Sequence, residues 1–214
     1  MGNQIKRCVI VSGAPETDLS FIQKNISQND YVICADSGYI KCTKLGIIPD
    51  LVIGDFDSSS IPDLACEIIT LNREKAYTDT FHCVMEAVER GYKNICILGA
   101  IGDRLDHTYA NILCLNYCLK NSVECCIINQ KNRISLIKNE KKINKDYSNF
   151  SLFAFLEPCN QVRINGAYYT AGFYSQEAID FETDSQMGVS NFVTDDYATV
   201  TVEKGILLLI ESND

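Results

Sequence analysis

Residues 50–58 read DLVIGDFDS, and this stretch indicates the fold. The unbroken apolar run from Leu51 to Ile53 is typical of a strand buried on both faces, as in a parallel sheet covered by helices. Asp55 and Asp57 follow directly after that strand. Alternate residues of an extended chain point to the same side, so the two carboxylates would lie close together and repel each other. The stretch therefore predicts a parallel sheet and a partner for its acids.

The sequence on either side of this stretch alternates between strand and helix patterns. Near-continuous apolar strands that alternate with helices are typical of an α/β domain built on a parallel sheet. The expected strands are residues 7–11, 31–35, 51–54, 67–71, 94–98 and 123–128, and the expected helices are residues 18–27, 37–46, 79–90 and 107–119.

The pattern changes near Gln130. Beyond it come short β-prone segments such as RISLI, NFSLFAFLE and ILLLIE, separated by turn signals and without an amphipathic helix. Such spacing predicts a β-sandwich or barrel. We therefore expect an α/β domain over residues 1–130 and an all-β domain over residues 131–214. The lysine-rich stretch KNEKKINKD, residues 138–146, is expected to form a solvated hairpin or loop.

Composition excludes several classes of protein. A net charge of −9 argues against a nucleic-acid partner. The 11 cysteines include no CxxC pair and the chain has 2 histidines, so a zinc site is not expected and the cysteines are interpreted as small buried hydrophobes. The sequence has no secretory signal pattern and no apolar run of about 18 residues. We expect a cytoplasmic protein without a membrane partner.

Polar side chains gather just after the expected strands. Ligands of open α/β sheets bind outside the carboxyl ends of the strands, so residues that follow different strands should meet at one edge. Asp36 follows the strand at 31–35, and Asp55 and Asp57 follow the strand at 51–54. The loop GAIGDRLDH, residues 99–107, follows the strand at 94–98. These side chains should therefore share one site.

The residue types at this edge suit metal-dependent phosphoryl transfer. Mg²⁺ prefers carboxylate oxygens together with substrate phosphates, and Asp79 at a helix start would be a third acid beside Asp55 and Asp57. Lys75 and Arg104 are suited to phosphate oxygens, and catalysis of this kind is mostly positioning and charge neutralisation. Simpler interpretations stay open: one aspartate can make a turn, and Thr78, Asp79 or Asp106 can cap a helix.

The motifs as a set resemble the thiamine pyrophosphokinase family. The matching stretches, in chain order, are ADSG (35–38), PDLVIGDFDS (49–58), EKAYTDT (74–80), GAIGDRLDHTYANI (99–112) and GVSN (188–191). The resemblance implies transfer of a pyrophosphoryl group from ATP to the hydroxyl of thiamine, with Mg²⁺ and with AMP as the leaving group. It also implies a nucleotide-binding α/β domain, then a smaller β-sandwich that helps bind thiamine, in a homodimer.

The resemblance assigns roles by motif. The catalytic and metal-binding acids would be Asp55, Asp57 and Asp79. The ATP-binding residues would be Asp36, Lys75, Arg104, Asp106 and His107, and the thiamine-binding residues would be Ser190 and Asn191.

Three positions depart from the family pattern. Ala76 stands where the family usually has an acid after the lysine, Ser37 replaces a glycine, and Phe192 follows the SN pair in place of an acid. Two other functions therefore stay open: a pyrophosphokinase for another alcohol, such as a hydroxymethyl-pterin, and a catalytically weakened nucleotide- or thiamine-binding protein. Whether Asp79 or Asp57 orients the acceptor hydroxyl also stays open.

Overall fold

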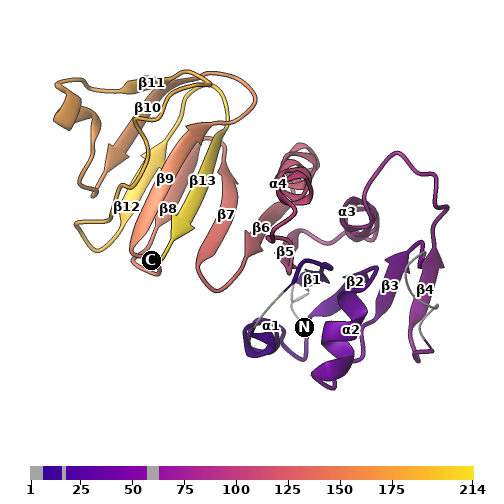
Figure 1. Cartoon of the computed structure of the whole chain (residues 1–214). Coiled ribbons are helices and arrows are strands. Elements are labelled where there is room, and N and C mark those ends of the chain that lie inside the picture. Colours follow the sequence, from indigo (N-terminus) through magenta and orange to yellow (C-terminus); the bar gives the residue numbers. More distant parts are fainter. Residues whose placement is uncertain (1–6, 16–17, 57–62) are drawn as a thin grey trace, which may run out of the picture. The chain divides into compact units, whose positions relative to one another are not determined.

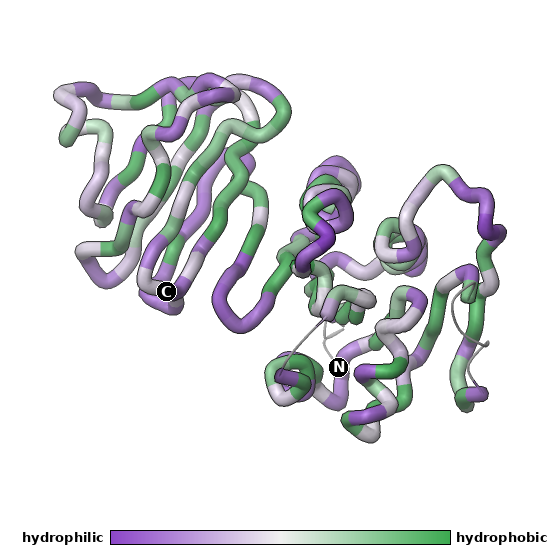
Figure 2. The backbone as a smooth tube through the Cα atoms, in the orientation of Figure 1, coloured by the Kyte–Doolittle hydropathy of each residue, from purple (hydrophilic) through white to green (hydrophobic). Residues whose placement is uncertain are grey.

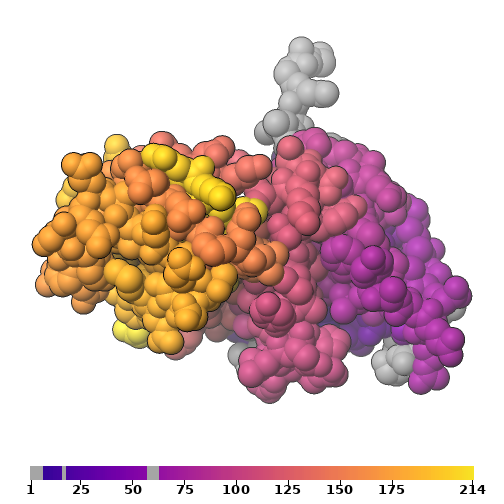
Figure 3. Space-filling model, turned by 90° about the horizontal axis from the view of Figure 1, so that it is seen from above, coloured from indigo at the N-terminus to yellow at the C-terminus, as the bar shows by residue number. Residues whose placement is uncertain are grey.

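The computed structural model describes residues 7–15, 18–56 and 63–214. Asp57 lies outside the described residues. The chain forms two compact units, Met1–Gln130 and Lys131–Asp214, whose surfaces are coloured by position in the sequence in Figure 3.

The first unit is built on a parallel sheet with strand order β4-β3-β2-β1-β5-β6 (Figure 1). This confirms the predicted α/β class. Its strands are β1 (Cys8–Val11), β2 (Tyr31–Ala35), β3 (Leu51–Gly54), β4 (Glu67–Thr70), β5 (Asn94–Leu98) and β6 (Glu124–Ile128). Its helices are α1 (Leu19–Lys24), α2 (Gly38–Lys44), α3 (Asp79–Glu89) and α4 (Leu105–Lys120).

The central strands of this sheet carry the core. All four residues of β1 and of β3 are buried, and Figure 2 shows the hydrophobic colour along these strands. Helix α2 packs closely on the sheet at Gly38, where an added Cβ would lie 2.0 Å from the Val11 carbonyl oxygen. All cysteines are free and most are buried, as predicted. No helix in the described part of the chain has the length and apolar character to span a bilayer.

The second unit contains three antiparallel strands in the order β7-β13-β9 and a separate four-stranded antiparallel sheet in the order β11-β10-β12-β8. One cluster of buried side chains draws on both groups of strands, for example Leu152, Val200 and Leu209. The strands are β7 (Asn132–Ile137), β8 (Glu140–Ile143), β9 (Asn149–Ala154), β10 (Cys159–Asn165), β11 (Ile179–Phe181), β12 (Ala198–Thr201) and β13 (Leu207–Ser212), with a 3₁₀ turn at Ala171–Tyr174.

The lysine-rich stretch differs from its predicted hairpin or loop. Within it, β8 is a strand that pairs with β12 rather than with its sequence neighbour β7. Ile143 is buried in the core of the second unit, whereas Glu140 and Lys142 are exposed. The sequence did not predict this strand because the charged run contains a single apolar residue, Ile143, and because β8 is stabilised by pairing with the distant strand β12.

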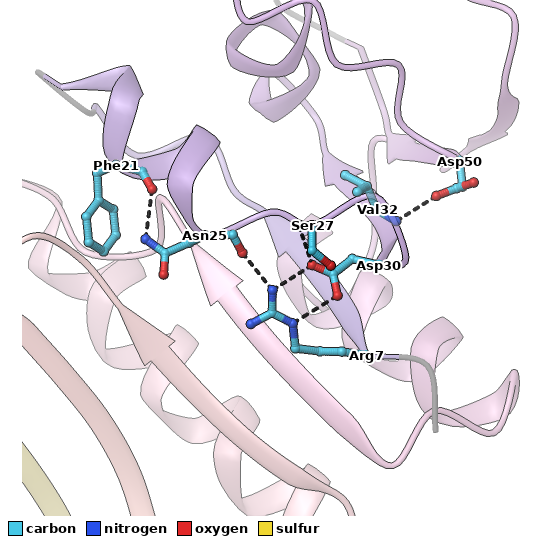
Figure 4. A network of polar contacts seen from close by, with 7 residues as sticks. All are labelled: Arg7, Phe21, Asn25, Ser27, Asp30, Val32 and Asp50. Atoms are coloured by element: carbon cyan, nitrogen blue, oxygen red, sulfur yellow. Dashed lines mark hydrogen bonds and ion pairs between the residues drawn. The ribbon is translucent and has the colours of Figure 1, made fainter. Parts of the chain in front are cut away.

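The amino ends of the strands carry a polar network of their own, opposite to the predicted site (Figure 4). Arg7 donates to both Asp30 carboxylate oxygens at 3.1 and 2.6 Å, and to the Asn25 carbonyl at 2.7 Å. Asp50 accepts from the Val32 amide at 2.7 Å. Asp50 is therefore a strand-linking residue at this edge, far along β3 from Asp55.

The Asp30 carboxylate should stabilise the fold in a pH-dependent way. Burial raises its pKa, but hydrogen bonds from Arg7 and the Ser27 amide outweigh burial and leave the pKa below the usual value. A depressed pKa contributes stability above the unfolded-state value of about 4 and loses it as the pH falls through the folded-state value. We expect Asp30→Asn to lower the free energy of unfolding by about 1–3 kcal/mol at pH 7.

Urea unfolding at pH 7 and near pH 3 measures this effect, with Asp103→Asn at an exposed position as the control. The difference in the free energy of unfolding between Asp30→Asn and wild type should be smaller at the lower pH. An equal gap at both values would contradict this account of the pair.

Candidate active site

A cavity of about 570 Å³ lies beyond the carboxyl ends of β1, β2, β3 and β5. Its lining comes from the loops after these strands and from the starts of α3 and α4. This is the edge at which open α/β sheets bind ligands. Of the residues predicted for the site, the cavity brings together Asp36, Asp55, Lys75, Asp79, Arg104 and His107.

Lys75 lies between two of the acids. Its ammonium group pairs with Asp55 Oδ2 and lies 3.0 Å from Asp79 Oδ1. Only 14% of the Lys75 and Asp55 side chains and 25% of Asp79 are exposed, so water screens these charges weakly. Burial lowers the pKa of Lys75, but hydrogen bonds to the two carboxylates outweigh burial and raise it. Lys75 therefore offsets the repulsion between the carboxylates of Asp55 and Asp79.

The backbone places Asp36 against Gly54, at the end of β3. Asp36 follows β2 with a positive φ of 43°, which aspartate tolerates better than most residues. Its Cα lies 3.0 Å and its Oδ1 3.2 Å from the position of a Cβ added at Gly54. Glycine at position 54 therefore allows the Asp36 carboxylate to pack against the end of β3, immediately before Asp55.

Asp79 is held by the start of helix α3. Thr78 is the N-cap, and its hydroxyl oxygen accepts from the Phe81 amide at 3.2 Å. Of the two residues predicted as possible caps of this helix, Thr78 takes the role and leaves the Asp79 carboxylate to face Lys75. An acid in the first turn is also favoured by the helix dipole. Asp79 thus faces Lys75 from the wall of the cavity.

The loop after β1 is fixed by contacts that the sequence did not reveal. The Lys41 ammonium of α2 donates to the carbonyl oxygens of Ser12 and Ala14, both at 2.5 Å. The buried hydroxyls of Ser12 and Thr80 lie 2.8 Å apart and join this loop to α3. Gly99 has a φ of 60°, and an added Cβ there would lie 2.7 Å from Lys41 Nζ.

The sequence did not identify Lys41 as a residue that holds this loop. A helical pattern predicts the helix but does not show which loop a long lysine side chain reaches. The sequence carries one weak signal for this loop, the stretch SGAP (residues 12–15), which places a glycine directly after a strand.

The loop after β5 is also held by local bonds. Asn111 Nδ2 donates to the Ala100 carbonyl at 2.8 Å, and the Thr108 hydroxyl lies 3.2 Å from both the amide and the carbonyl of Gly102. These contacts set the path of the chain into α4. Asn111 and Thr108 were missed as separate site residues because their role is to shape the loop.

Arg104 and Asp106 form an exposed ion pair at 2.6 Å, with 72% and 64% of the side chains accessible. The hydrogen bond from Arg104 lowers the pKa of Asp106 to about 2. Arg104 and His107 line the cavity, whereas Asp106 is absent from its lining. Asp106 lies in the first turn of α4, and Arg104 occupies the N-cap position. Asp106 is therefore not the N-cap of α4, which was one of its possible roles.

Ser190 and Asn191 belong to the second unit. Ser190 is exposed and has a φ of 57°. Asn191 is only 2% exposed, and its side-chain oxygen accepts from the amides of Tyr169 and Phe192, both at 2.9 Å. Its Nδ2 donates to the Tyr169 carbonyl at 2.8 Å. The Asn191 amide is thus engaged in holding the backbone of this unit.

The acids suit a magnesium ion by the chemistry of their donors. Carboxylate oxygens of Asp55 and Asp79 converge on one cation already, the Lys75 ammonium. In the described residues no group of three or more histidine, cysteine or acidic side chains is close enough to hold a metal alone. Mg²⁺ commonly binds through one or two carboxylates plus substrate phosphates and water, and the described acids fit that mode.

Comparison with known proteins finds relatives along nearly the whole chain. Residues 22–127 match the family model described as the catalytic domain of thiamin pyrophosphokinase. The thiamine pyrophosphokinase of Bacillus subtilis (strain 168) is 27% identical over 221 residues, an alignment that covers 98% of this chain and 100% of that protein.

Solved structures share the fold over the same range. The thiamine pyrophosphokinase structure from Bacillus subtilis has a TM-score of 0.87 and 26% identity, and the match covers 98% of this chain and 100% of that one. The structure from Geobacillus thermodenitrificans has a TM-score of 0.83 at 24% identity, and the match covers 97% of this chain and 98% of that one. The structure from Candida albicans has a TM-score of 0.74 at 20% identity, and the match covers 97% of this chain and 89% of that one. The last two matches support the fold alone.

The fold is that of an α/β protein with a cavity at the carboxyl ends of its parallel strands. The chain belongs to the thiamin pyrophosphokinase family, as the resemblance of its motifs predicted.

The contacts of Lys41 predict its effect on the loop after β1. Lys41→Met keeps the length of the side chain but removes the donor to the Ser12 and Ala14 carbonyls. We expect a loss of about 1–3 kcal/mol in the free energy of unfolding and faster amide hydrogen exchange in the peptide that contains residues 12–15.

Mass spectrometry after hydrogen exchange checks this result, and Lys44→Met is the matched control because Lys44 is exposed on the same helix. If the two variants exchange and unfold alike, Lys41 does not hold the loop.

Proposed function

We propose that this protein transfers a pyrophosphoryl group from Mg·ATP to the hydroxyl of thiamine, giving thiamine diphosphate and AMP. The observation that supports this most directly is the pair of acids around Lys75, at a cavity beyond parallel strands, in a chain of the thiamin pyrophosphokinase family. The proteins with full-length similarity carry the name thiamine pyrophosphokinase.

The proposal assigns ATP binding and catalysis to residues 1–130 and thiamine binding to the β-sandwich of residues 131–214. It also has the enzyme working as a cytoplasmic homodimer. Ser190 and Asn191 would help form the thiamine pocket. The internal hydrogen bonds of Asn191 suit an indirect role, in which it fixes the backbone so that its neighbours can contact the acceptor.

ATP would bind through its phosphates along the cavity wall. Arg104 offers a planar fork for phosphate oxygens, and its pairing with Asp106 keeps the guanidinium oriented in the free protein. The N-terminus of the 11-residue helix α3 adds backbone amides that favour anions. His107 and Asp36 would line the nucleotide site beside these groups.

Mg²⁺ would be held by Asp55 and Asp79, with Asp57 as the third acid of the motif. When bound, the ion would offset negative charge on the phosphates. The chain's own residues would then position the reactants: the acceptor hydroxyl oxygen forms a bond to the β-phosphorus while the bond from that phosphorus to the α-phosphate oxygen breaks. Asp79 or Asp57 would orient the hydroxyl and accept its proton, and AMP would leave.

Because position 76 is alanine, the remaining acids must support this chemistry without a carboxylate at that position. Ala76 lines the cavity between Lys75 and Tyr77, where the family motif usually has an acid. Phosphoryl transfer depends mainly on positioning and charge neutralisation, and two described acids with their lysine meet that need. We therefore assign turnover to the chain as it stands.

Incubation with Mg·ATP and thiamine provides the test. We expect AMP and thiamine diphosphate in equal amounts, and a fall in kcat of about 10²–10³-fold for Asp55→Asn or Asp79→Asn, because each removes charge that organises the phosphates. Asp63→Asn, at an exposed position before β4, is the control and should behave as wild type.

Formation of ADP in place of AMP would contradict the proposal, as would product formation that does not depend on thiamine. Preference for a hydroxymethyl-pterin in direct competition would replace thiamine as the acceptor. Binding of both ligands without turnover would identify a binding protein.

A further inference from the structure

We propose that Lys75 couples entry of the metal to entry of the nucleotide. In the free protein its ammonium group holds Asp55 and Asp79 together, and when Mg·ATP binds it moves from the carboxylates to the phosphates. The site would then bind free Mg²⁺ poorly and Mg·ATP well. This inference rests on the proposed function and adds a positioning role for Lys75 that is separate from simple phosphate contact.

The geometry places the lysine where the metal is needed. The carboxylate oxygens of Asp55 and Asp79 both face Lys75 Nζ, at 3.0 Å in the case of Asp79. The point on which these oxygens converge is therefore already taken by a positive charge. A metal ion that used the same oxygens would have to displace the ammonium group or lie next to it.

The charges make this displacement depend on the nucleotide. The described side chains that line the cavity carry three negative charges, on Asp36, Asp55 and Asp79, and three positive charges, on Arg73, Lys75 and Arg104. These charges balance, so a divalent ion alone would leave an excess of positive charge in the cavity. Only 14% of the Lys75 side chain is exposed, which limits relief by solvent. Mg·ATP is a net anion, and its phosphate oxygens would give the displaced ammonium group new acceptors.

Ala76 makes the coupling stronger in this chain. An acid at position 76 would add negative charge beside Lys75 and favour a free cation. Alanine adds none, although position 76 lines the same cavity. The two acids that pair with Lys75 therefore have less help in attracting a metal before the nucleotide arrives.

Metal binding without turnover tests the coupling. Mn²⁺ is used as the probe for Mg²⁺, and electron paramagnetic resonance measures its affinity for the protein alone and with α,β-methylene-ATP, which lacks the scissile oxygen bridge. We expect Lys75→Met to bind free Mn²⁺ about 10-fold more tightly than wild type, because a like charge is removed. The same variant should bind the Mn²⁺ complex of the analogue about 10-fold more weakly, because a phosphate partner is lost.

Two further variants keep the test specific. Lys75→Arg retains the positive charge and should keep the low affinity of wild type for free Mn²⁺. Lys44→Met removes an exposed lysine from α2 and should change neither affinity. Thermal unfolding checks that each variant is folded. If Lys75→Met does not fold, wild type and Lys75→Arg still test the inference, because both carry a positive charge at position 75. Tight binding of free Mn²⁺ by these two proteins would overturn the inference.

The coupling and the proposed function can fail separately. If wild type makes AMP and thiamine diphosphate but Lys75→Met binds free Mn²⁺ no more tightly, the coupling is wrong and the function stands. If wild type binds neither Mn²⁺ with the analogue nor thiamine and shows no turnover, the proposed function is wrong, and the coupling that rests on it falls as well.

Discussion

The ion pairs of Lys75 with Asp55 and Asp79 are the interaction on which the candidate site depends. Two acids on different elements, one after β3 and one at the start of α3, line one cavity with a single ammonium group between them. Without that group, the two carboxylates would repel each other in a place where water screens charge weakly. The parallel sheet brings the elements together, and Lys75 makes their approach electrostatically stable.

Much of the fold followed from local pattern. Strands β2, β3 and β5 have the predicted bounds, because each is an unbroken apolar run that can be stable only inside a covered parallel sheet. Their shared direction then required the polar residues that follow them to lie at one edge. Strand β8 was missed because its pairing with β12 is a contact between distant segments, and the sequence of β8 carries a single buried apolar residue, Ile143.

The site was predictable in its location and residue types and less so in its contacts. The motifs placed Asp55, Lys75 and Asp79 in one site, but residue spacing does not show that a lysine 20 positions from Asp55 pairs with it. Lys41 was missed altogether, since its role depends on how α2 packs over the loop after β1. The assignment of Asn191 to the thiamine site stays a prediction, and its buried hydrogen bonds show a contact that the motif did not reveal, the support of the surrounding backbone.

The central claim is that Asp55, Lys75 and Asp79 form the site for a metal–triphosphate complex. A crystal structure with Mg²⁺ and α,β-methylene-ATP tests it most directly. The account predicts Mg²⁺ bound to oxygens of Asp55 and Asp79 and to the phosphates, with Lys75 Nζ bonded to a phosphate oxygen. Lys75 still paired with both acids, and the metal and phosphates bound elsewhere on the protein, would contradict it.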